Sequence, residues 1–429
     1  MRPLACAAFL LVAVTARPAS AQGLPSAPAH EVGLDSTRLA AIAPLLTGAV
    51  ERGELSGVVT LVARHGRVAA LDSAGFRNTA RRTPIGSATL FRIASMTKPV
   101  TSAAAMILVE EGRLGLADPV ARYIPAFARM TVAAASNDPA GASASVPARR
   151  PITILDLLTH RSGLTYGFLD DGPVGDAYRS AGVSDGMPTR EEAIAANVDR
   201  LAKLPLVAQP GARFQYGLSV DVLGRVIEIV SGQTLAVFLE ERLFGPLQMH
   251  DTRFYVADDQ VERLATPYAW NGRRLRPMQA SERFGDLLLA GEGYRGSRTW
   301  FSGGSGLVST VGDYARFLQM ILNGGELDGV RVLGPKTVQL LSADALAGTE
   351  HPLGRGAGFG LGFQVATELG PSGEPGSVGT LSWSGIYGTM LWADPEEQLI
   401  GIVMLQRFPT AGLTLGERFR AIAYGAVID

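Results

Sequence analysis

The sequence is short of two residue types whose scarcity is informative. Of 429 residues only Cys6 is a cysteine, so the chain cannot form an internal disulfide. Lysine is rare as well: of 39 basic residues three are lysines, Lys98, Lys203 and Lys336, which leaves 36 arginines. A lysine in this chain therefore calls for a specific explanation.

An excess of charge of one sign is also missing. The chain has 39 basic and 40 acidic side chains, for a formal net charge of -1. A protein that binds nucleic acid needs a basic surface, so we expect no nucleic-acid partner. With 47% hydrophobic and 18% charged residues the composition is that of a globular protein. At about 150 residues per domain, the length predicts two or three domains.

Long apolar runs are confined to the N-terminus. Arg2, the apolar run Leu4–Val14 and the small residues at 19–21 have the order of a secretory signal peptide. The run is too short for a stable membrane anchor, and no later segment is long enough. We therefore expect residues 1–21 to be removed and the protein to be periplasmic or secreted. The alternative is a buried N-terminal helix. After cleavage no cysteine remains, which excludes thiol catalysis.

Strand patterns lie near both ends of the chain, and helical patterns lie between them. This order predicts one sheet assembled from the two termini and an inserted helical domain. We place an α/β domain at 22–90 and 291–429 and a mainly helical domain at 91–290, with the active site between them. The expected strands are 58–63, 68–71, 359–365, 389–393 and 399–405. The expected helices are 34–51, 94–111, 154–159, 220–231, 235–243, 413–423 and one that runs from Thr310 to Asn323.

Ser95 and Lys98 form the chemically informative pair. Three residues apart at the start of a helix, they lie on one face and are close enough to share a proton. A serine hydroxyl becomes a nucleophile when a base removes its proton, and a desolvated lysine can be that base. The alternative is a capping serine beside a solvated lysine. The residues that follow Lys98 are nearly all apolar, which predicts a buried helix and favours the catalytic interpretation.

A second serine fits a known catalytic pattern. Ser184 lies in Gly182-Val183-Ser184-Asp185-Gly186, which matches the G-x-S-x-G nucleophile elbow of α/β-hydrolases. That elbow requires a buried strand before it and a helix directly after it. Residues 170–181 are polar and broken by glycine, so no strand is expected there. We therefore do not expect Ser184 to be the nucleophile.

The segment 95–98, Ser-Met-Thr-Lys, resembles the S-x-x-K box of serine β-lactamases and penicillin-binding proteins. Three further segments match in the same order: Leu-Thr-His-Arg-Ser-Gly-Leu at 158–164, Phe-Gln-Tyr-Gly-Leu at 214–218, and Trp-Ser-Gly-Ile at 383–386. The pattern is most similar to class C β-lactamases and to the family VIII carboxylesterases. This resemblance implies a β-lactamase/transpeptidase-like fold, with an antiparallel sheet flanked by helices, over essentially the whole mature chain.

The resemblance also implies roles for individual residues. Ser95 would be the acylated nucleophile, and Lys98 and Tyr216 would form the base system. The backbone N–H groups of Ser95 and Ile386 would form the oxyanion hole. A phenol close to an ammonium is easier to ionise, which fits this role of Tyr216; its alternative is a packed aromatic residue. The expected substrate contacts are Tyr166, Leu218, Trp383, Ser384, Gly385 and Tyr387.

Two departures from the β-lactamase pattern bear on the substrate. Leu218 replaces the asparagine of the Y-x-N box, which in the family contacts the β-lactam amide. Trp383 replaces the lysine of the K-T-G box, which helps to hold the substrate carboxylate. We therefore expect a small-molecule carboxylic ester as substrate. The alternatives are a class C-type β-lactamase or D-Ala-D-Ala carboxypeptidase/D-aminopeptidase, and a non-catalytic binding protein of the same fold.

The remaining motifs point to no cofactor. The five histidines are scattered without metal-ligand spacing, so neither a metal nor a cofactor is expected. His160 is expected to be structural. The Gly-Gly-Ser-Gly run at 303–306 lacks the lysine of a phosphate loop and predicts a tight turn. Phe168, Tyr294 and Trp300 are possible pocket residues, although packing is the commoner role of such aromatics. The oligomeric state cannot be predicted.

Overall fold

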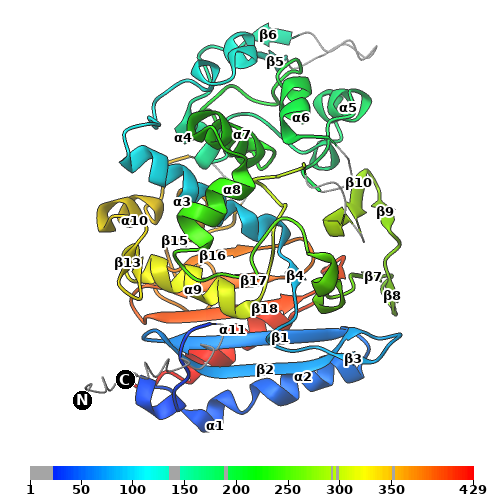
Figure 1. The fold of residues 1–429 in the computed structure, drawn as a ribbon, viewed down its shortest axis with the longest axis vertical. Coiled ribbons are helices and arrows are strands. Elements are labelled where there is room, and N and C mark those ends of the chain that lie inside the picture. The colour runs from blue at the N-terminus through cyan, green and yellow to red at the C-terminus, as the bar shows by residue number, and fades with distance from the viewer. Residues whose placement is uncertain (1–22, 135–144, 188–191, 291–292, 296–298, 350–352) are drawn as a thin grey trace, which may run out of the picture.

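The computed structural model describes residues 23–134, 145–187, 192–290, 293–295, 299–349 and 353–429, so the expected signal peptide lies outside the described residues. Its centre is an eight-stranded antiparallel sheet in the order β14-β15-β16-β17-β18-β1-β2-β3 (Figure 1). The strands are β1 Gly57–Arg64, β2 Arg67–Asn78, β3 Thr83–Pro84, β14 Ala357–Phe359, β15 Gln364–Ala366, β16 Leu381–Ser384, β17 Met390–Asp394 and β18 Leu399–Leu405. Because β1 pairs with β18, the sheet joins both ends of the chain, as predicted.

The other elements surround this sheet. The α-helices are α1 Ser36–Leu39, α2 Ile42–Glu51, α3 Thr97–Glu110, α4 Ile154–Leu158, α5 Pro173–Ser180, α6 Ile194–Leu201, α7 Ser219–Ser231, α8 Leu235–Leu239, α9 Val311–Leu322, α10 Pro335–Leu341 and α11 Leu415–Gly425. The small strands are β4 Phe91–Arg92, β5 Thr131–Ala133, β6 Ser145–Pro147, β7 Tyr268–Trp270, β8 Leu275–Pro277, β9 Ser281–Phe284, β10 Leu287–Ala290, β11 Val308–Ser309, β12 Glu326–Leu327, β13 Val330–Arg331 and β19 Arg407–Phe408. The fold class is confirmed; the domain boundaries stay a prediction.

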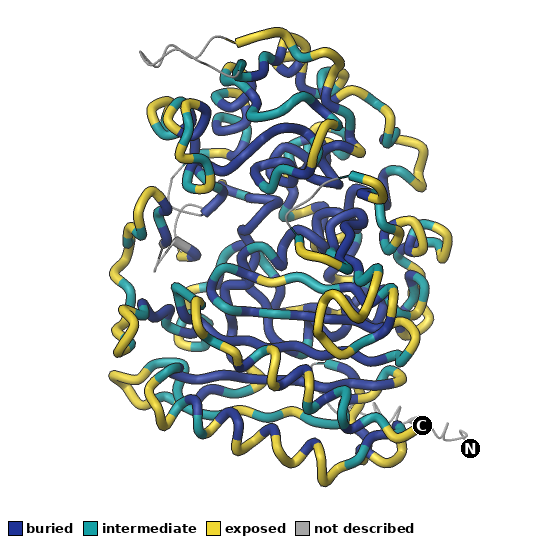
Figure 2. Tube along the Cα trace, turned by 180° about the vertical axis from the view of Figure 1, so that it is seen from behind, coloured by how far each residue is buried: buried dark blue, intermediate teal, exposed yellow. Residues whose placement is uncertain are grey.

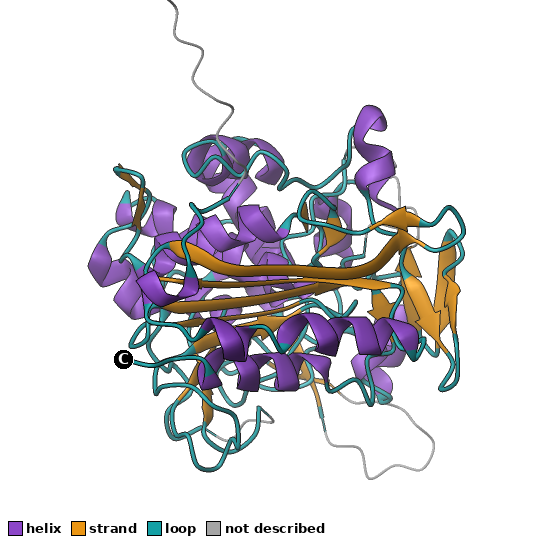
Figure 3. Ribbon diagram, turned by 90° about the horizontal axis from the view of Figure 1, so that it is seen from below, coloured by secondary structure: helices purple, strands orange, loops and turns teal. Residues whose placement is uncertain are grey.

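Helices cover both faces of the sheet. The helices α2 and α11 lie on one face, and Figure 3 shows them side by side across it. The helix α9 covers the other face and contacts β1, β17 and β18. Beyond α9 lie α3, α4, α7 and α8, and in Figure 1 the elements α5, α6, β5 and β6 lie at the top of the molecule, farthest from the sheet. Since both faces are covered, all eight residues of β1 are buried.

The two faces of β1 belong to two hydrophobic cores. Val59 and Leu61 pack into the large core that includes α3, α7 and α9. Val58 and Val62 pack into the second core, against α2 and α11. This alternation follows from the two-residue repeat of a strand. Figure 2 shows the buried trace running from the sheet into the helical half, while the exposed residues lie on outer helices and loops.

Several expected elements are divided in the structure. The expected strand 359–365 is instead the hairpin of β14 and β15, because Gly362 has φ +98°, which a continuous strand cannot contain. The expected helix 34–51 is divided into α1 and α2. The expected helix 94–111 begins with the 3₁₀ turn Ala94–Met96, and α8 continues as the π-helical turn Glu240–Phe244.

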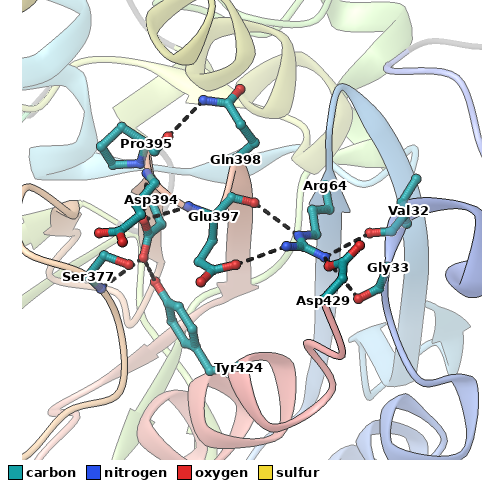
Figure 4. Close-up of polar contacts among 11 residues, drawn as sticks. Val32, Gly33, Arg64, Ser377, Asp394, Pro395, Glu397, Gln398, Tyr424 and Asp429 are labelled. Carbon is teal, nitrogen blue, oxygen red and sulfur yellow. Dashed lines mark hydrogen bonds and ion pairs between the residues drawn. The ribbon is translucent and has the colours of Figure 1, made fainter.

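One edge of the molecule is joined by a polar network around Arg64 (Figure 4). The guanidinium of Arg64, a residue that is 4% exposed, donates hydrogen bonds to the carbonyl oxygens of Val32, Gly33 and Glu397 at 2.9–3.1 Å. It also forms ion pairs with the carboxylates of Glu397 (2.9 Å) and Asp429. Arg64 therefore ties the N-terminal segment, the end of β1, the β17–β18 turn and the last residue together.

Asp394 organises the neighbouring part of the same edge (Figure 4). Its carboxylate accepts hydrogen bonds from the Ser377 N–H at 2.9 Å and from the Tyr424 hydroxyl at 2.8 Å. It also accepts from two backbone amides of the β17–β18 turn, at 3.0 and 3.1 Å. The turn between β17 and β18 is thus held by the side chain that begins it.

Among the described residues, no single helix has the length and apolar composition to cross a membrane. The pair Ser219–Ser231 and Leu235–Phe244 meets those requirements only jointly and is bent by 81° at the break between its parts.

Candidate active site

Ser95 lies in the short 3₁₀ turn Ala94–Met96, directly after β4 and before α3. Ala94 has φ +43°, a conformation that costs energy for a residue other than glycine and is frequent at functional sites. Ala94 and Met96 are fully buried, whereas Ser95 is partly exposed. The backbone is therefore held firmly in the core, and the serine faces outward.

Lys98 lies beneath Ser95 and has no exposed surface. Its Nζ is 3.1 Å from Ser95 Oγ, as the spacing of the two residues predicts. It is also 3.0 Å from the Tyr166 hydroxyl and 2.9 Å from the carbonyl oxygen of Gly304. The structure thus brings the predicted nucleophile and the predicted base together, inside a set of neutral oxygens.

Two tyrosines flank the Lys98 amine. Its Nζ is 4.7 Å from the centre of the Tyr216 ring and 5.4 Å from that of the Tyr166 ring. Within the described part of the chain, the Tyr216 hydroxyl makes no hydrogen bond, and Tyr216 is partly exposed. The tyrosine whose hydroxyl contacts Lys98 is therefore Tyr166, which sequence reasoning placed only among the substrate contacts. No motif around residue 166 signals this contact.

Burial separates the chemistry of these two phenols. Tyr166 is 3% exposed, and its burial, together with the nearby Tyr216 and Asp221, holds its pKa well above the ordinary value. Tyr166 is therefore a neutral phenol at ordinary pH. It can donate one hydrogen bond and accept others, but it is a poor source of a phenolate.

The two tyrosine segments are fixed against each other. A Cβ atom at Gly217 would lie 2.5 Å from both Leu164 O and Thr165 Cα, so only glycine allows this approach. The Gln215 side chain donates to Thr165 Oγ1 at 3.1 Å, and its backbone N–H donates to the carbonyl oxygen of His160 at 2.7 Å. The Leu-Thr-His-Arg-Ser-Gly-Leu segment and the tyrosine segment are thus one structural unit.

His160 packs behind Tyr216. Its ring lies 4.8 Å from that of Tyr216 and 5.6 Å from that of Phe214, and it has no exposed surface. Neither ring nitrogen has a hydrogen-bond partner among the described residues. Burial, and secondarily the charge of Lys98, hold the pKa of His160 well below its ordinary value. A neutral imidazole packed against the Tyr216 ring supports the position of that ring.

The turn after β16 carries the second predicted oxyanion donor, Ile386. The Gly385 N–H donates to Thr389 O at 2.8 Å, and Thr389 Oγ1 reaches Ile93 O at 3.4 Å. Ile386 therefore lies close to the segment that precedes Ser95, and it is partly exposed. No hydrogen bond of its backbone N–H is found in the described ranges. The Ser95 N–H lies in the first turn of a helix, where backbone donors lack intrahelical acceptors.

The other expected substrate contacts divide by exposure. Trp383, in β16, is partly exposed, and its ring lies 5.6 Å from that of Tyr216 and 5.2 Å from that of Phe359. Ser384 is exposed and Phe168 partly exposed. The rest are buried: Leu218, Gly385, Tyr387, Tyr294 and Trp300. A substrate contact stays a prediction for the exposed and the buried residues alike.

Ser184 does not lie on a nucleophile elbow. It is 8% exposed in a loop that follows α5, with no strand before it. Its backbone N–H and carbonyl oxygen are bonded to the side-chain amide of Asn197 at 2.8 and 3.0 Å. The expectation drawn from its sequence context agrees with this geometry.

A buried carboxylate completes the surroundings of Lys98. Asp221, on α7, is 1% exposed and accepts from Ser302 Oγ at 2.5 Å and from Gly304 N–H at 3.3 Å. Burial raises its pKa, and the Ser302 hydrogen bond and the Lys98 charge oppose this rise. Asp221 thereby holds the turn whose carbonyl contacts Lys98. Within the described residues, no group of three or more His, Cys, Asp or Glu side chains could hold a metal ion.

The chain is similar to known proteins over most of its length. The Beta-lactamase family model matches residues 42–425. Protein Rv1367c of Mycobacterium tuberculosis (strain ATCC 25618 / H37Rv) is 40% identical over 371 residues, and Esterase EstB of Burkholderia gladioli is 34% identical over 377 residues; each match covers 84% of this chain and 88% of the relative. The solved structure of EstCE1, a hydrolase with promiscuous acyltransferase activity, has a TM-score of 0.79 and 30% identity, and the match covers 91% of this chain and 99% of that one.

Proposed function

The chain belongs to the beta-lactamase family and is a serine hydrolase of the carboxylesterase type, and from this premise we propose that it cleaves small carboxylic esters through an acyl-enzyme on Ser95. One observation carries the proposal. The hydroxyl of the partly exposed Ser95 is 3.1 Å from the amine of Lys98, a lysine without exposed surface in a chain that has three lysines. A buried amine beside an accessible hydroxyl has the geometry of a nucleophile and its base.

In the first proposed step, the pair of Lys98 and Tyr216 accepts the Ser95 proton while Oγ attacks the ester carbonyl carbon. The oxygen of the tetrahedral intermediate becomes negative and is stabilised by the N–H groups of Ser95 and Ile386. The intermediate then collapses, the bond to the alcohol oxygen breaks, and that oxygen takes up the proton. The acid portion remains as an ester on Ser95.

The second step repeats the chemistry with water. The Lys98 and Tyr216 pair removes a proton from water, the resulting hydroxide attacks the acyl carbonyl, and the same two N–H groups stabilise the new intermediate. Collapse returns the proton to Ser95 Oγ and releases the carboxylic acid. Tyr216, being partly exposed, is the better placed of the two tyrosines to contact water and the leaving alcohol.

The surroundings of Ser95 favour a neutral substrate. The partly exposed side chains near it are apolar or aromatic: Phe168, Tyr216, Trp383 and Ile386. Lys98 is buried beneath Ser95, and its amine already contacts three oxygens. A β-lactam or a peptide terminus carries a carboxylate for which these side chains supply no opposite charge. An uncharged ester has no such requirement.

The test compares three proteins on two kinds of substrate. Wild type, Ser95→Ala and Ser184→Ala are assayed with p-nitrophenyl acetate and butyrate and with a chromogenic cephalosporin. We expect ester turnover that disappears in Ser95→Ala, persists in Ser184→Ala and greatly exceeds cephalosporin turnover. Ester turnover that survives Ser95→Ala would overturn the proposed nucleophile. Preferred cephalosporin turnover would support the β-lactamase alternative.

A second reaction, acyl transfer to an alcohol, is favoured by one comparison. EstCE1 is described as a hydrolase with promiscuous acyltransferase activity, and this chain matches 99% of its length. An alcohol can replace water in the second step without any change of catalytic groups. Product analysis in water with added alcohol, by chromatography, tests this: new ester supports transfer, and acid alone contradicts it.

We also propose export to the periplasm or medium, on the basis of the signal-like order in residues 1–21. N-terminal sequencing of the protein from fractionated cells of a bacterial expression host tests it. A mature terminus near residue 22 in the exported fraction is the expected result. An intact N-terminus in the cytoplasmic fraction would contradict it.

A further inference from the structure

The loop Gly182–Gly186, whose sequence resembles a nucleophile elbow, lies against the segments that carry two of the three hydrogen-bond partners of the Lys98 amine, Tyr166 and Gly304. We propose that this loop positions Lys98 for the reaction, and that Asp185 is the residue through which it acts. The inference rests on the proposed function of Ser95 and Lys98. Among the described residues no hydrogen bond joins Asp185 to Ser95 or Lys98, so we assign it a positioning role.

The first contact is with the tyrosine that binds Lys98. Asp185 Oδ1 accepts a hydrogen bond of 2.7 Å from the N–H of Gly167, the residue directly after Tyr166. Arg179, on α5, donates to the carbonyl oxygen of the same Gly167. Backbone groups on both sides of residue 167 are thus held by side chains from the segment 179–185. This fixes Tyr166, whose hydroxyl is 3.0 Å from Lys98 Nζ.

The second contact is with the turn that supplies the Gly304 carbonyl. Gly186 has φ +87°, and a Cβ atom there would lie 2.8 Å from Ser305 Oγ and 3.2 Å from Asp221 Oδ1. The Gly186 carbonyl oxygen accepts from Trp300 Nε1 at 3.1 Å. The loop therefore fits closely behind the turn whose Gly304 oxygen is 2.9 Å from Lys98 Nζ.

The loop itself is rigidly held. Asn197, on α6, is 1% exposed and bonds both backbone polar groups of Ser184. Ser184 is bonded to α6 and Gly186 to Trp300, so the backbone on both sides of Asp185 is fixed. The Asp185 carboxylate is thereby held within hydrogen-bond distance of the Gly167 N–H. The G-x-S-x-G sequence therefore belongs here to a closely packed loop and not to a nucleophile elbow.

Asp185 can change its charge near neutral pH. Burial raises the pKa of its carboxyl to about 6, and the nearby Asp221 and Asp286 act in the same direction. The hydrogen bond from Gly167 and the charge of Arg179 act in the opposite direction. These groups face Asp185 from α7, from the β9–β10 hairpin, from the loop after Tyr166 and from α5.

A polar cavity gives Asp185 room to exchange protons. Its volume is about 140 Å³, and its lining includes Asp185, Arg179 and Ser184 on one side and Arg283 and Asp286 of the β9–β10 hairpin on the other. A polar cavity of that size has space for several water molecules. The carboxyl can therefore equilibrate with solvent even though it is mostly buried.

The consequence for catalysis has a definite sign. The ionised carboxylate accepts a stronger hydrogen bond from the Gly167 N–H than the protonated acid does. As pH falls through about 6, Asp185 becomes protonated and its hold on the Tyr166 segment weakens. Lys98 is then less well positioned, and kcat for ester hydrolysis falls. Above that pH the carboxylate is ionised, and Asp185 no longer lowers kcat.

The kinetic test is the pH profile of kcat for p-nitrophenyl butyrate between pH 5 and 8. Wild type is expected to lose activity below about pH 6. Asp185→Asn, which keeps the shape and an acceptor oxygen but not the charge, is expected to have kcat about tenfold lower at pH 8 and no loss near pH 6. Asp176→Asn is the matched control, because Asp176 is a nearby carboxylate that pairs with Arg179 but is exposed and does not contact Gly167. It should behave as wild type. Asp185→Asn with the wild-type rate or the wild-type acid limb would overturn the proposal.

A second measurement does not depend on turnover. Hydrogen exchange of a peptide that contains Gly167, corrected for the intrinsic effect of pH, reports the Asp185 contact directly. We expect exchange at Gly167 to be about tenfold faster in Asp185→Asn than in wild type at pH 7. Equal protection would overturn the positioning role. If wild type hydrolyses no ester, the proposed function fails, and the exchange measurement still decides on the loop.

Discussion

Arg64 and Lys98 are both cations buried in the interior, but different kinds of oxygen surround them. Arg64 is 4% exposed and meets two carboxylates, those of Glu397 and Asp429, besides backbone carbonyls. Lys98 has no exposed surface and meets one carbonyl and two hydroxyls. Within the residues that the structure describes, no carboxylate lies within ion-pair distance of Lys98 Nζ.

The difference separates a cation that stabilises the fold, Arg64, from a basic residue that is proposed to act in catalysis, Lys98. Carboxylates and carbonyls only accept hydrogen bonds, so the Arg64 network suits one state, a permanent cation. The hydroxyls of Ser95 and Tyr166 both donate and accept, so they can serve as partners for an ammonium or for a free amine. A base must pass between those two states during each turnover. The oxygens around Lys98 can therefore bind either an ammonium or a free amine, whereas those around Arg64 suit only a cation.

The largest expected effect is on catalysis at Lys98. Lys98→Met keeps an unbranched side chain of similar length and removes the proposed base, so kcat/KM for p-nitrophenyl butyrate should fall at least about 10³-fold. The substitution removes a buried polar group from the core but leaves the Gly304 carbonyl oxygen without its donor, so thermal unfolding should occur close to the wild-type temperature. An active Lys98→Met enzyme would remove the basis of the comparison.

The next effect distinguishes the two tyrosines. Tyr216→Phe removes a proposed member of the base pair and should lower kcat about 10²-fold or more, whereas Tyr166→Phe removes a positioning contact and should lower it about tenfold. Steady-state kinetics of both variants, with circular dichroism as a check on folding, measure the difference. The reverse order of the two losses would assign Tyr166 to the base pair.

Arg64→Met should show the opposite pattern to Lys98→Met. It leaves carbonyls and the Glu397 carboxylate without their donor, and the free energy of unfolding should fall by about 2 kcal/mol, less than for a pair buried on both sides because Asp429 is exposed. Urea denaturation measures the loss. The kcat of the folded variant should equal that of wild type; a lower kcat would show that the two regions are coupled.

The smallest expected effect is that of Tyr424→Phe. Its hydroxyl donates to Asp394 at 2.8 Å on the same edge of the molecule as Arg64. Loss of one such hydrogen bond should lower the free energy of unfolding by about 1 kcal/mol, without a change in kcat. This variant is also the control for the two active-site tyrosines, because it removes a bonded phenol hydroxyl far from Ser95. A change in kcat would show that the tyrosine variants act through general destabilisation.

Much of the sheet could be predicted from the sequence because its signals are local. The hairpin of β1 and β2 turns at His65 and Gly66, which have φ of +52° and +78°, and the run 399–405 is a strand over its full predicted length. The prediction of one strand over 359–365 was wrong, because apolar composition does not show where a glycine reverses the chain. The turn at Ala94 was missed for a related reason: its positive φ is imposed by the packing around it.

The candidate site was predictable to the extent that it lies in motifs. The spacing of Ser95 and Lys98 predicts their contact, since one helical turn brings them together. No spacing predicts that the Tyr166 hydroxyl reaches Lys98, because that contact joins residues 68 apart in the chain. The position of Asp185 is likewise a result of tertiary packing. The G-x-S-x-G pattern around it would indicate a nucleophilic serine and gives no sign of a positioning carboxylate.

The central claim is that Ser95 carries the acyl group, and the most direct test is to find the group there. Enzyme mixed with p-nitrophenyl acetate is quenched in acid within one turnover, digested with pepsin and analysed by mass spectrometry. We predict that the peptide containing Ser95 gains the mass of one acetyl group, and that this adduct is absent in Lys98→Met at the same time. An acetyl group on the peptide containing Ser184, or steady turnover without any adduct on Ser95, would contradict the account.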